Sequence, residues 1–447
     1  MSGDGLFSEL PDQAKPRPAE DMRGALRLRE PVRDQIELRA VDIDSLIGQG
    51  HPARIFWGYV AGLDLSELED RIEARENTPG HPAASPRLMV ALWLYASSEG
   101  VGSARALARL CQSHDVYRWL CGGVSMNHHS LADFRVGCAD LLDRLLTEHL
   151  VALAEAGIVD LGTLAQDGVR IRASAGAASF RREAKLEQHL ASVGAIVQAL
   201  KREVDEHPDA SNQRIKAARE RAARERGERI AAAQKTLSEI KAQRQQRDAT
   251  HGKPSKPPSK PQKEPRASTT DPEARVMKMA DGGFRPAYNV QVVSAAGEQI
   301  VVDVAPCTAG SDRGLMRQRL EAVRERLGRL PGRHLADGGF TSAADIEWAH
   351  AEGIEVYCPP TQSKHGTDPF KPRRDDGPGV LAWRSRMASE EGKARYKRRS
   401  ICECIHARWR NWNLRQVTVR GVKKVTALVL WFALANNILQ GHRLATP

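Results

Sequence analysis

Three acidic residues stand in local sequences that suit chemistry better than simple exposure to solvent. Asp167 lies within a predicted strand and is followed by Gly168. Asp337 ends a short apolar strand and precedes two glycines, which let the backbone turn sharply there. Glu403 is an acid inside a strongly basic helical segment. Carboxylates that meet from strand ends and one helix can bind two hard divalent cations. Such cations promote phosphodiester cleavage by activating a nucleophile and stabilising the leaving oxygen.

Each acid also has an ordinary explanation, as a helix cap, a turn former or one partner of a surface ion pair. For any single acid, periodicity alone favours that explanation. We give Asp271 and Asp281 only this interpretation, as a cap and a turn residue. Cys402 and Cys404 flank Glu403, but no Cys-x-x-Cys or His pair accompanies them, so they are poor zinc ligands.

Positive charge and aromatic rings gather around Glu403. Such a mixture suits a channel for a DNA backbone, in which the cations contact phosphates and the rings stack on bases. The alternative is a solvated helix face. The basic residues are Lys393, Arg395, Lys397, Arg398, Arg399, Arg408, Arg410, Arg415, Arg420, Lys423 and Lys424, and Trp409 and Trp412 are interleaved with them.

The composition of the whole chain agrees with a polyanionic partner. Its 447 residues carry a formal net charge of +11, and this length leaves room for two or three domains. The seven cysteines are scattered and odd in number, which indicates a reduced, cytoplasmic setting. Residues 425–439 form the longest apolar region, but Thr426, Asn436 and Asn437 interrupt it. We therefore predict a buried helix there and no membrane partner.

The N-terminal third is predicted to be helical. Residues 1–35 are polar and contain prolines, so we expect a disordered leader, followed by a helical DNA-binding domain over 36–155. Within this domain, short helices near 103–110 and 130–135, separated by a pair of glycines, suggest a helix-turn-helix-like module. An ordinary helical bundle is the alternative. We interpret His128–His129 as a solvent-exposed pair before a helix rather than as metal ligands.

Residues 181–248 are predicted to form an antiparallel helical hairpin. Apolar residues from Leu186 to Val204 follow heptad spacing, a His-Pro-Asp sequence then breaks the helix, and a second apolar seam follows from Ile215. We expect this hairpin to be an insertion that packs little against the sheet. Residues 249–265 are rich in Lys and Pro and are predicted to be a flexible linker.

The segments on either side of the hairpin, 156–180 and 266–447, predict an α/β domain. Strands and helices alternate along them, which favours a mixed sheet with helices on both faces. The predicted strands are 161–175, 288–294, 299–304, 333–336 and 354–358, and the predicted helices are 311–328, 343–351, 393–409 and 418–439.

Many of these stretches, in the same order, resemble the bacterial insertion-sequence DDE transposases. That family has a helical N-terminal transposase domain followed by an RNase H-like catalytic domain. The resemblance spans roughly residues 40 to 440. The matching segments are 42–47, 51–54, 85–88, 102–107, 130–135, 166–173, 270–275, 288–291, 335–342, 420–425 and 435–438.

The most specific part of the resemblance lies around Glu403. Related transposases place a Tyr, an Arg, a Glu and a Lys with two, three and six residues between them. Tyr396, Arg399, Glu403 and Arg410 fall at these intervals. The last position differs from the family, because Arg410 replaces the Lys. A planar guanidinium and a compact ammonium do not make identical phosphate contacts.

The resemblance implies a catalytic triad and a metal. Asp167, Asp337 and Glu403 would hold two Mg²⁺ ions, with Mn²⁺ as a substitute, for cleavage of the transposon ends and strand transfer into target DNA. The carboxyl carbons should then lie within roughly 8 Å of one another. The DNA-binding residues would be Tyr396, Arg399, Arg408, Trp409, Arg410 and Arg420.

The expected partner is double-stranded DNA, both the transposon ends and the target, bound by a homodimer in a nucleoid-associated, cytoplasmic setting. Arg399 has a second interpretation, as an intrahelical ion pair with Glu403. Two other functions remain open. One is a transposase-derived protein that binds DNA without cutting it, and the other is a metal-dependent nuclease that cuts without joining.

Overall fold

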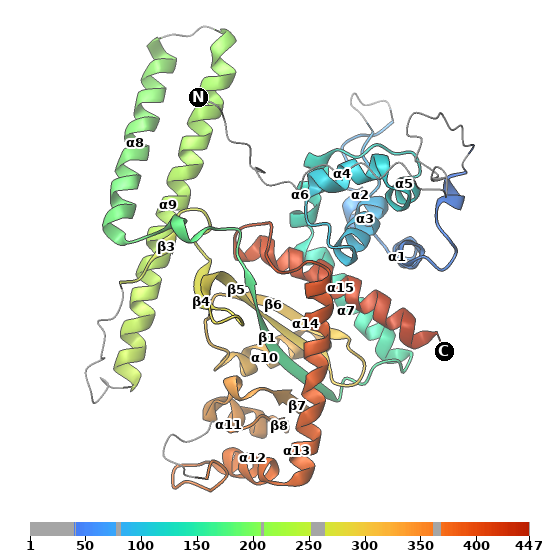
Figure 1. Cartoon of the computed structure of the whole chain (residues 1–447), viewed down its shortest axis with the longest axis vertical. Coiled ribbons are helices and arrows are strands. Elements are labelled where there is room, and N and C mark those ends of the chain that lie inside the picture. Colours follow the sequence, from blue (N-terminus) through green and yellow to red (C-terminus); the bar gives the residue numbers. More distant parts are fainter. Residues whose placement is uncertain are drawn as a thin grey trace, which may run out of the picture. The chain divides into compact units, whose positions relative to one another are not determined.

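A computed structural model gives the structure of the chain (Figure 1). Ile43–Pro447 form one compact unit, separate from Met1–Asp42. The predicted leader over 1–35, the helix break at 207–209 and most of the predicted linker lie outside the described residues. The structure describes residue 40 and residues 42–76, 82–206, 210–251, 264–360 and 368–446.

The N-terminal part is helical, as predicted. Asn127 Oδ1 accepts a hydrogen bond from the backbone N–H of His129 at 2.9 Å and so caps α6. Helix α4 packs against both α5 and α6, so three helices, and not two, make up the expected helix-turn-helix-like region. The elements are η1 (Ile43–Leu46), α1 (Pro52–Ala61), α2 (Ser66–Glu69), α3 (Pro86–Ser98), α4 (Ala104–Ser113), α5 (Asp115–Cys121), α6 (His128–Gly137) and α7 (Ala139–Glu155).

The centre of the structure is a mixed sheet of six strands among the described residues, in the order β4-β5-β1-β7-β8, with β6 beside β5. Strands β1, β7 and β8 run parallel, whereas β4, β5 and β6 pair antiparallel, and β5 also pairs antiparallel with β1. The bounds are β1 (Thr163–Arg172), β4 (Arg275–Lys278), β5 (Phe284–Ala295), β6 (Val301–Cys307), β7 (Arg333–Ala336) and β8 (Glu355–Tyr357).

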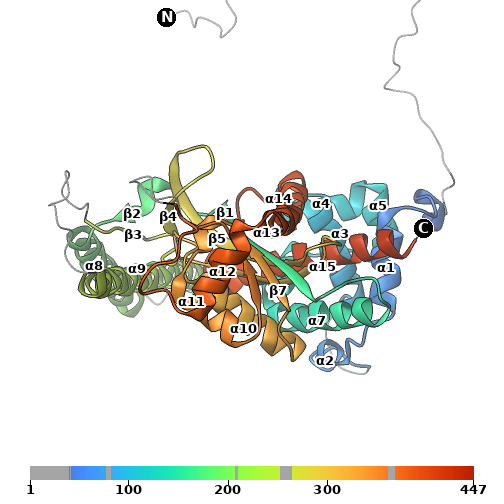
Figure 2. The same cartoon turned by 90° about the horizontal axis from the view of Figure 1, so that it is seen from below.

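Helices cover both faces of this sheet (Figure 2). Neighbouring residues of a strand point to opposite faces. On one face of β1, Gln166 Nε2 donates to the backbone oxygen of Leu315 at the start of α10. On the other face, α14 contacts β1 and β5. These helices are α10 (Leu315–Leu327), α11 (Ala343–Ala351), α12 (Pro378–Ala388), α13 (Glu390–Lys397), the short η4 (Arg398–Ser400) and α14 (Ile401–Asn411).

The last helix, α15 (Val422–Ala445), joins the helical part to the sheet. It contacts α3 and α7 as well as β6. It is long and apolar enough to span a membrane, but 72% of its apolar stretch is buried within the structure. The predicted buried helix is therefore confirmed. Asn437 is fully buried, and its side chain accepts from Val301 N at 2.7 Å and donates to Val301 O at 2.7 Å.

The predicted hairpin is present as α8 (Glu183–Glu206) and α9 (Ala210–His251). The two helices pack along an apolar seam that includes Leu186, Val193 and Ile230. Ile215, expected in this seam, is 54% exposed, because it lies near the start of α9, beyond the packed stretch. The start of the linker at residue 249 is also wrong, since α9 continues to His251.

The hairpin lies between the two strands of a small sheet that the sequence did not predict. Strand β2 (Phe180–Arg181) pairs with β3 (Ala267–Ser268), and α9 contacts β3. The hairpin is therefore inserted between β1 and the remaining strands of the main sheet. Together with this mixed sheet and the helical N-terminal part, it confirms the predicted fold class, an RNase H-like α/β fold with an all-α N-terminal domain.

Asn437 provides a test of how α15 is held. Asn437→Ala leaves a buried N–H and a buried C=O of Val301 without partners, so we expect a loss of roughly 2–6 kcal/mol in unfolding free energy. The measurement is the midpoint of chemical denaturation. Leu444→Ala, at an exposed position of the same helix, is the control and should change stability by less than about 0.5 kcal/mol. Equal effects of the two variants would contradict this role.

Removal of the hairpin tests whether it is an insertion. We expect a chain that joins Arg182 to Glu264 through a short linker, and so keeps the β2–β3 pairing, to remain folded. The reason is that the hairpin's apolar residues mainly contact each other. Circular dichroism and thermal melting measure the outcome. A wholly unfolded product would show that the hairpin is part of the core.

Candidate active site

The first two predicted acids follow adjacent positions of parallel strands. β1 pairs with β7 from Thr163↔Arg333 to Gln166↔Ala336. After these paired residues comes Asp167 in β1 and, directly after the end of β7, Asp337. Paired strands lie about 4.8 Å apart, so the backbones that carry these two acids are neighbours at the same end of the sheet. Asp337 Oδ1 also accepts from Gly339 N at 2.7 Å, which fixes the turn after β7.

Arg399 links the third acid to the first. Its Nη1 lies 3.3 Å from Asp167 Oδ2, and its Nη2 lies 2.8 Å from Glu403 Oε1. The guanidinium carbon lies 5.9 Å from the centre of the Tyr396 ring. The second interpretation of Arg399, an ion pair with Glu403, is therefore present in the structure, together with an ion pair to Asp167 that the sequence did not predict.

The local helix geometry makes this bridge possible. The single predicted helix over 393–409 is divided into α13, η4 and α14. Arg399 lies in η4, and Glu403 lies in the first turn of α14, four residues later. Residues at this spacing share one helix face, and that face is the one that meets β1.

The electrostatic environment of Asp167 is unusual. Burial raises the pKa of Asp167 to about 6, the charge of Arg399 opposes this rise, and the charge of Asp337 adds to it. A buried carboxylate beside a second carboxylate favours a neighbouring positive charge. Arg399 supplies that charge in this structure. The side chain of Glu403 is 62% exposed, so its charge is largely solvated.

His406 is a further residue of this site that sequence reasoning missed. Its Nδ1 lies 3.7 Å from Asp167 Oδ2, and its Nε2 is buried without a hydrogen-bond partner among the described residues. Burial, together with the charges of Arg410 and Arg399, lowers the pKa of His406 to about 4, so the imidazole is neutral. The sequence contained one indication of this role. His406 follows Glu403 by three residues, and this spacing puts both side chains on the same helix face.

On the opposite face of the sheet, buried polar side chains tie the strands together. His334 Nε2 lies 3.2 Å from Gln166 Oε1, and Gln166 Nε2 donates to Gln291 Oε1 at 2.9 Å. Gln291 Nε2 donates to Asp312 Oδ1 at 2.9 Å, and Asn289 Nδ2 donates to the same oxygen at 2.6 Å. This chain of bonds crosses β7, β1 and β5 and fixes the register that places Asp167 beside Asp337.

Two of the predicted DNA-binding residues are not available to DNA. Trp409 is 1% exposed and packs edge-on against Phe432, with ring centres 6.3 Å apart. Arg408 donates to Asn436 Oδ1 at 2.6 Å and to Gln299 Oε1 at 2.7 Å, so it holds α14 against α15 and the turn before β6. The predictions for Trp409 and Arg408 are wrong because α15 covers their side of α14.

The other predicted DNA-binding residues differ in exposure. Arg410 and Arg420 are exposed, and Arg420 Nε donates to Ser174 O at 3.2 Å. Tyr396 is half-buried and packs against the apolar cluster under β7 and β8. Arg410 and Arg420 are thus the exposed cations of the predicted set, and Tyr396 supports Arg399.

The donor set fits a hard divalent cation in its chemistry. The three acids offer carboxylate oxygens, and two of them come from the neighbouring strand segments of β1 and β7. Within the described ranges, however, no three His, Cys, Asp or Glu side chains are close enough to form a ready-made metal site. Arg399 lies between Asp167 and Glu403, so Glu403 joins the other acids only through its guanidinium.

Gly168 provides a test of the packing behind Asp167. A Cβ at this position would lie 2.5 Å from Asp312 Oδ1 and 2.5 Å from Gln291 Nε2. We expect Gly168→Ala to lower the unfolding free energy by about 1–3 kcal/mol because β1 must shift. Gly176→Ala is the control, since nothing lies within 4 Å of a Cβ there. Thermal melting of both variants measures the difference, and a neutral Gly168→Ala would contradict the close packing.

Two family models match the chain. Residues 41–136 match a family described as "Transposase domain (DUF772)", and residues 239–438 match a family described as "Transposase DDE domain". The second match includes Asp337 and Glu403 but begins after Asp167. The chain has no match among curated proteins or solved structures. The two family matches together cover more than half of the chain, in the order expected from the resemblance. The chain therefore belongs to the insertion-sequence transposases that carry a DDE catalytic domain.

Proposed function

We propose that this protein cuts the ends of its transposon and joins them to target DNA in a metal-dependent reaction. Asp167, Asp337 and Glu403 would be the metal-binding carboxylates, with Mg²⁺ as the cofactor and Mn²⁺ as a substitute. The observation that carries the proposal is the register of β1 and β7, in which Asp167 of β1 and Asp337, directly after β7, follow the paired residues Gln166 and Ala336. Glu403 belongs to the same group because Arg399 links it to Asp167.

The residues of the site would have different roles in the reaction. When bound, divalent cations activate the attacking water or 3′-hydroxyl and stabilise the leaving oxygen. The protein's own part is to orient oxygen donors and to exclude water around Asp167, which is mostly buried. Arg399 forms an ion pair with both Asp167 and Glu403 in the present structure. Its planar guanidinium is also suited to a phosphate of the DNA strand.

DNA would contact exposed cations of the catalytic domain. Arg410 and Arg420 are exposed, and the chain carries a formal net charge of +11. Cations of this kind bind the phosphate backbone without regard to sequence. We propose double-stranded DNA as the partner, a homodimer as the form bound to it, and a cytoplasmic, nucleoid-associated location.

A substitution at Glu403 separates an enzyme from a DNA-binding protein without catalysis. Glu403→Gln keeps the shape and removes the negative charge. We expect metal-dependent nicking of a plasmid that bears the element's ends to fall by at least about 100-fold, since loss of a ligand should exceed the 10–100-fold cost of losing an outer-shell partner. DNA affinity, measured by filter binding, should stay equal or rise slightly, because an acid beside the phosphate path repels DNA.

The matched control is Glu391→Gln, an isosteric change on α13 at an exposed acid that pairs with Arg395. It should nick like the parent protein. Nicking by Glu403→Gln at the parental rate would rule out Glu403 as a metal ligand. Nicking of random DNA by the parent, without joining of ends, would instead identify a nuclease.

A further inference from the structure

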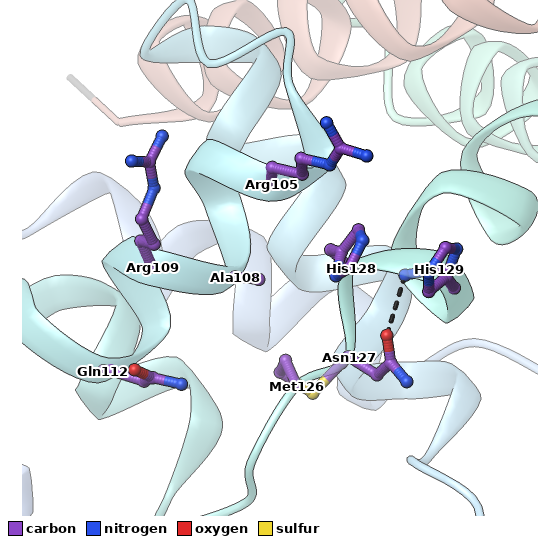
Figure 3. Close-up of a pocket in the computed structure, with 8 residues that line it drawn as sticks. All are labelled: Arg105, Ala108, Arg109, Gln112, Met126, Asn127, His128 and His129. Atoms are coloured by element: carbon purple, nitrogen blue, oxygen red, sulfur yellow. Dashed lines mark hydrogen bonds between the residues drawn. The ribbon is translucent and has the colours of Figure 1, made fainter.

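A groove in the helical N-terminal part contains two arginines that pair with no acid in the described part of the chain. It has a volume of about 720 Å³ and lies between α4 and the start of α6 (Figure 3). The lining that the structure describes includes no acidic side chain. Its polar lining comes from Arg105, Arg109 and Gln112 of α4 and from Asn127, His128 and His129 at the start of α6.

The α4 side of the groove is a stripe of hydrogen-bond donors. Arg105, Arg109 and Gln112 follow helical spacing, so they share one face of α4, and all three are exposed. Figure 3 shows both guanidinium groups pointing out from the helix. Four residues of helix separate the two arginines by about 6 Å along the axis. They can therefore contact neighbouring phosphates of one strand.

The α6 side adds to the positive potential. His128 and His129 stand at the start of α6, with ring centres 4.1 Å apart, where the helix dipole is positive. Burial and the charges of His129 and Arg105 lower the pKa of His128. The rings of both histidines line the groove beside two permanent cations.

Several other arginines of the helical part pair with acids, unlike those of the groove. Arg54 pairs with Asp44, Arg118 with Asp115, and Arg144 with Glu148, all in the same helical part. Among the described residues, the side chains of Arg105 and Arg109 have no ion pair and no hydrogen bond. Unpaired, exposed guanidinium groups without a nearby acid are suited to a polyanion.

We propose that this groove binds the phosphodiester backbone of double-stranded DNA. The inference rests on the proposed function and deepens it, because it assigns a DNA contact to residues outside the catalytic domain. Arginine and imidazole donors recognise phosphates, and phosphate contacts carry no sequence information. The contact should therefore hold the DNA with equal strength at the transposon ends and at random sequence.

The test is a double variant, Arg105→Ala with Arg109→Ala, in the full chain. Affinity for a duplex of random sequence and for a duplex of the element's end is measured by filter binding between about 50 and 200 mM salt. Loss of two phosphate contacts should lower the slope of log affinity against log salt concentration by about 1.8. The loss of affinity should be the same for both duplexes.

Two controls accompany this measurement. Arg118→Ala removes an exposed arginine of α5 that already pairs with Asp115, and it should leave the slope unchanged. The double variant Arg105→Lys with Arg109→Lys keeps both charges and should restore the parental slope. Thermal melting of all variants checks the fold.

Three results would overturn the inference. One is a parental slope and affinity in the double alanine variant. Another is an equal loss in Arg118→Ala. A third is a loss confined to the element's ends, because the groove would then read bases rather than backbone. Failure of the proposed function is a separate result, since it would appear as absence of metal-dependent nicking by the parent protein.

Discussion

Helix α15 is apolar on nearly every side, and a helix of this kind must be surrounded by other elements. Helices α3 and α7 cover it on one side and β6 on another. The side chain of Asn437 forms hydrogen bonds with the backbone N–H and the backbone C=O of Val301, and these bonds fix β6 against the helix. β6 pairs with β5, β5 with β1, and β1 with β7. The position of the carboxylates therefore depends on how α15 is buried, which explains why the helical part and the sheet form one compact unit.

The main electrostatic constraint is the charge of Asp167. A buried carboxylate is costly without a compensating charge, and Asp337 on the next strand increases that cost. Arg399 compensates for it, and its side chain is only 16% exposed. Glu403 adds little to the cost because water solvates most of its side chain. The buried acid Asp167 thus needs a neighbouring cation, whereas the exposed acid Glu403 is solvated and can change its side-chain position.

Much of the fold could be predicted because local patterns determine it. The strand at 333–336 and the helix at 343–351 agree with the structure to the residue. Strand β4 and the β2–β3 pair were missed because they are short, and the partners in the β2–β3 pair are also distant in sequence. Trp409 was assigned to DNA wrongly because composition does not show which side of α14 is covered by α15. His406 was missed because its meaning depends on Asp167, which lies in a different element.

The arginines show why net charge alone does not locate a binding surface. Arg326 is almost buried and pairs with Asp143 of α7 and with Asp303 of β6, so its charge holds the helical part to the sheet. Arg135 is also buried and donates to Gly102 O and Thr418 Oγ1. Buried positive charges of this kind cannot contact a polyanion, although they contribute to the formal net charge. The charge available to DNA is carried by exposed side chains without acidic partners. In the described part of the chain, Arg105 and Arg109 meet that condition in the N-terminal groove, far along the sequence from the basic segment around Glu403.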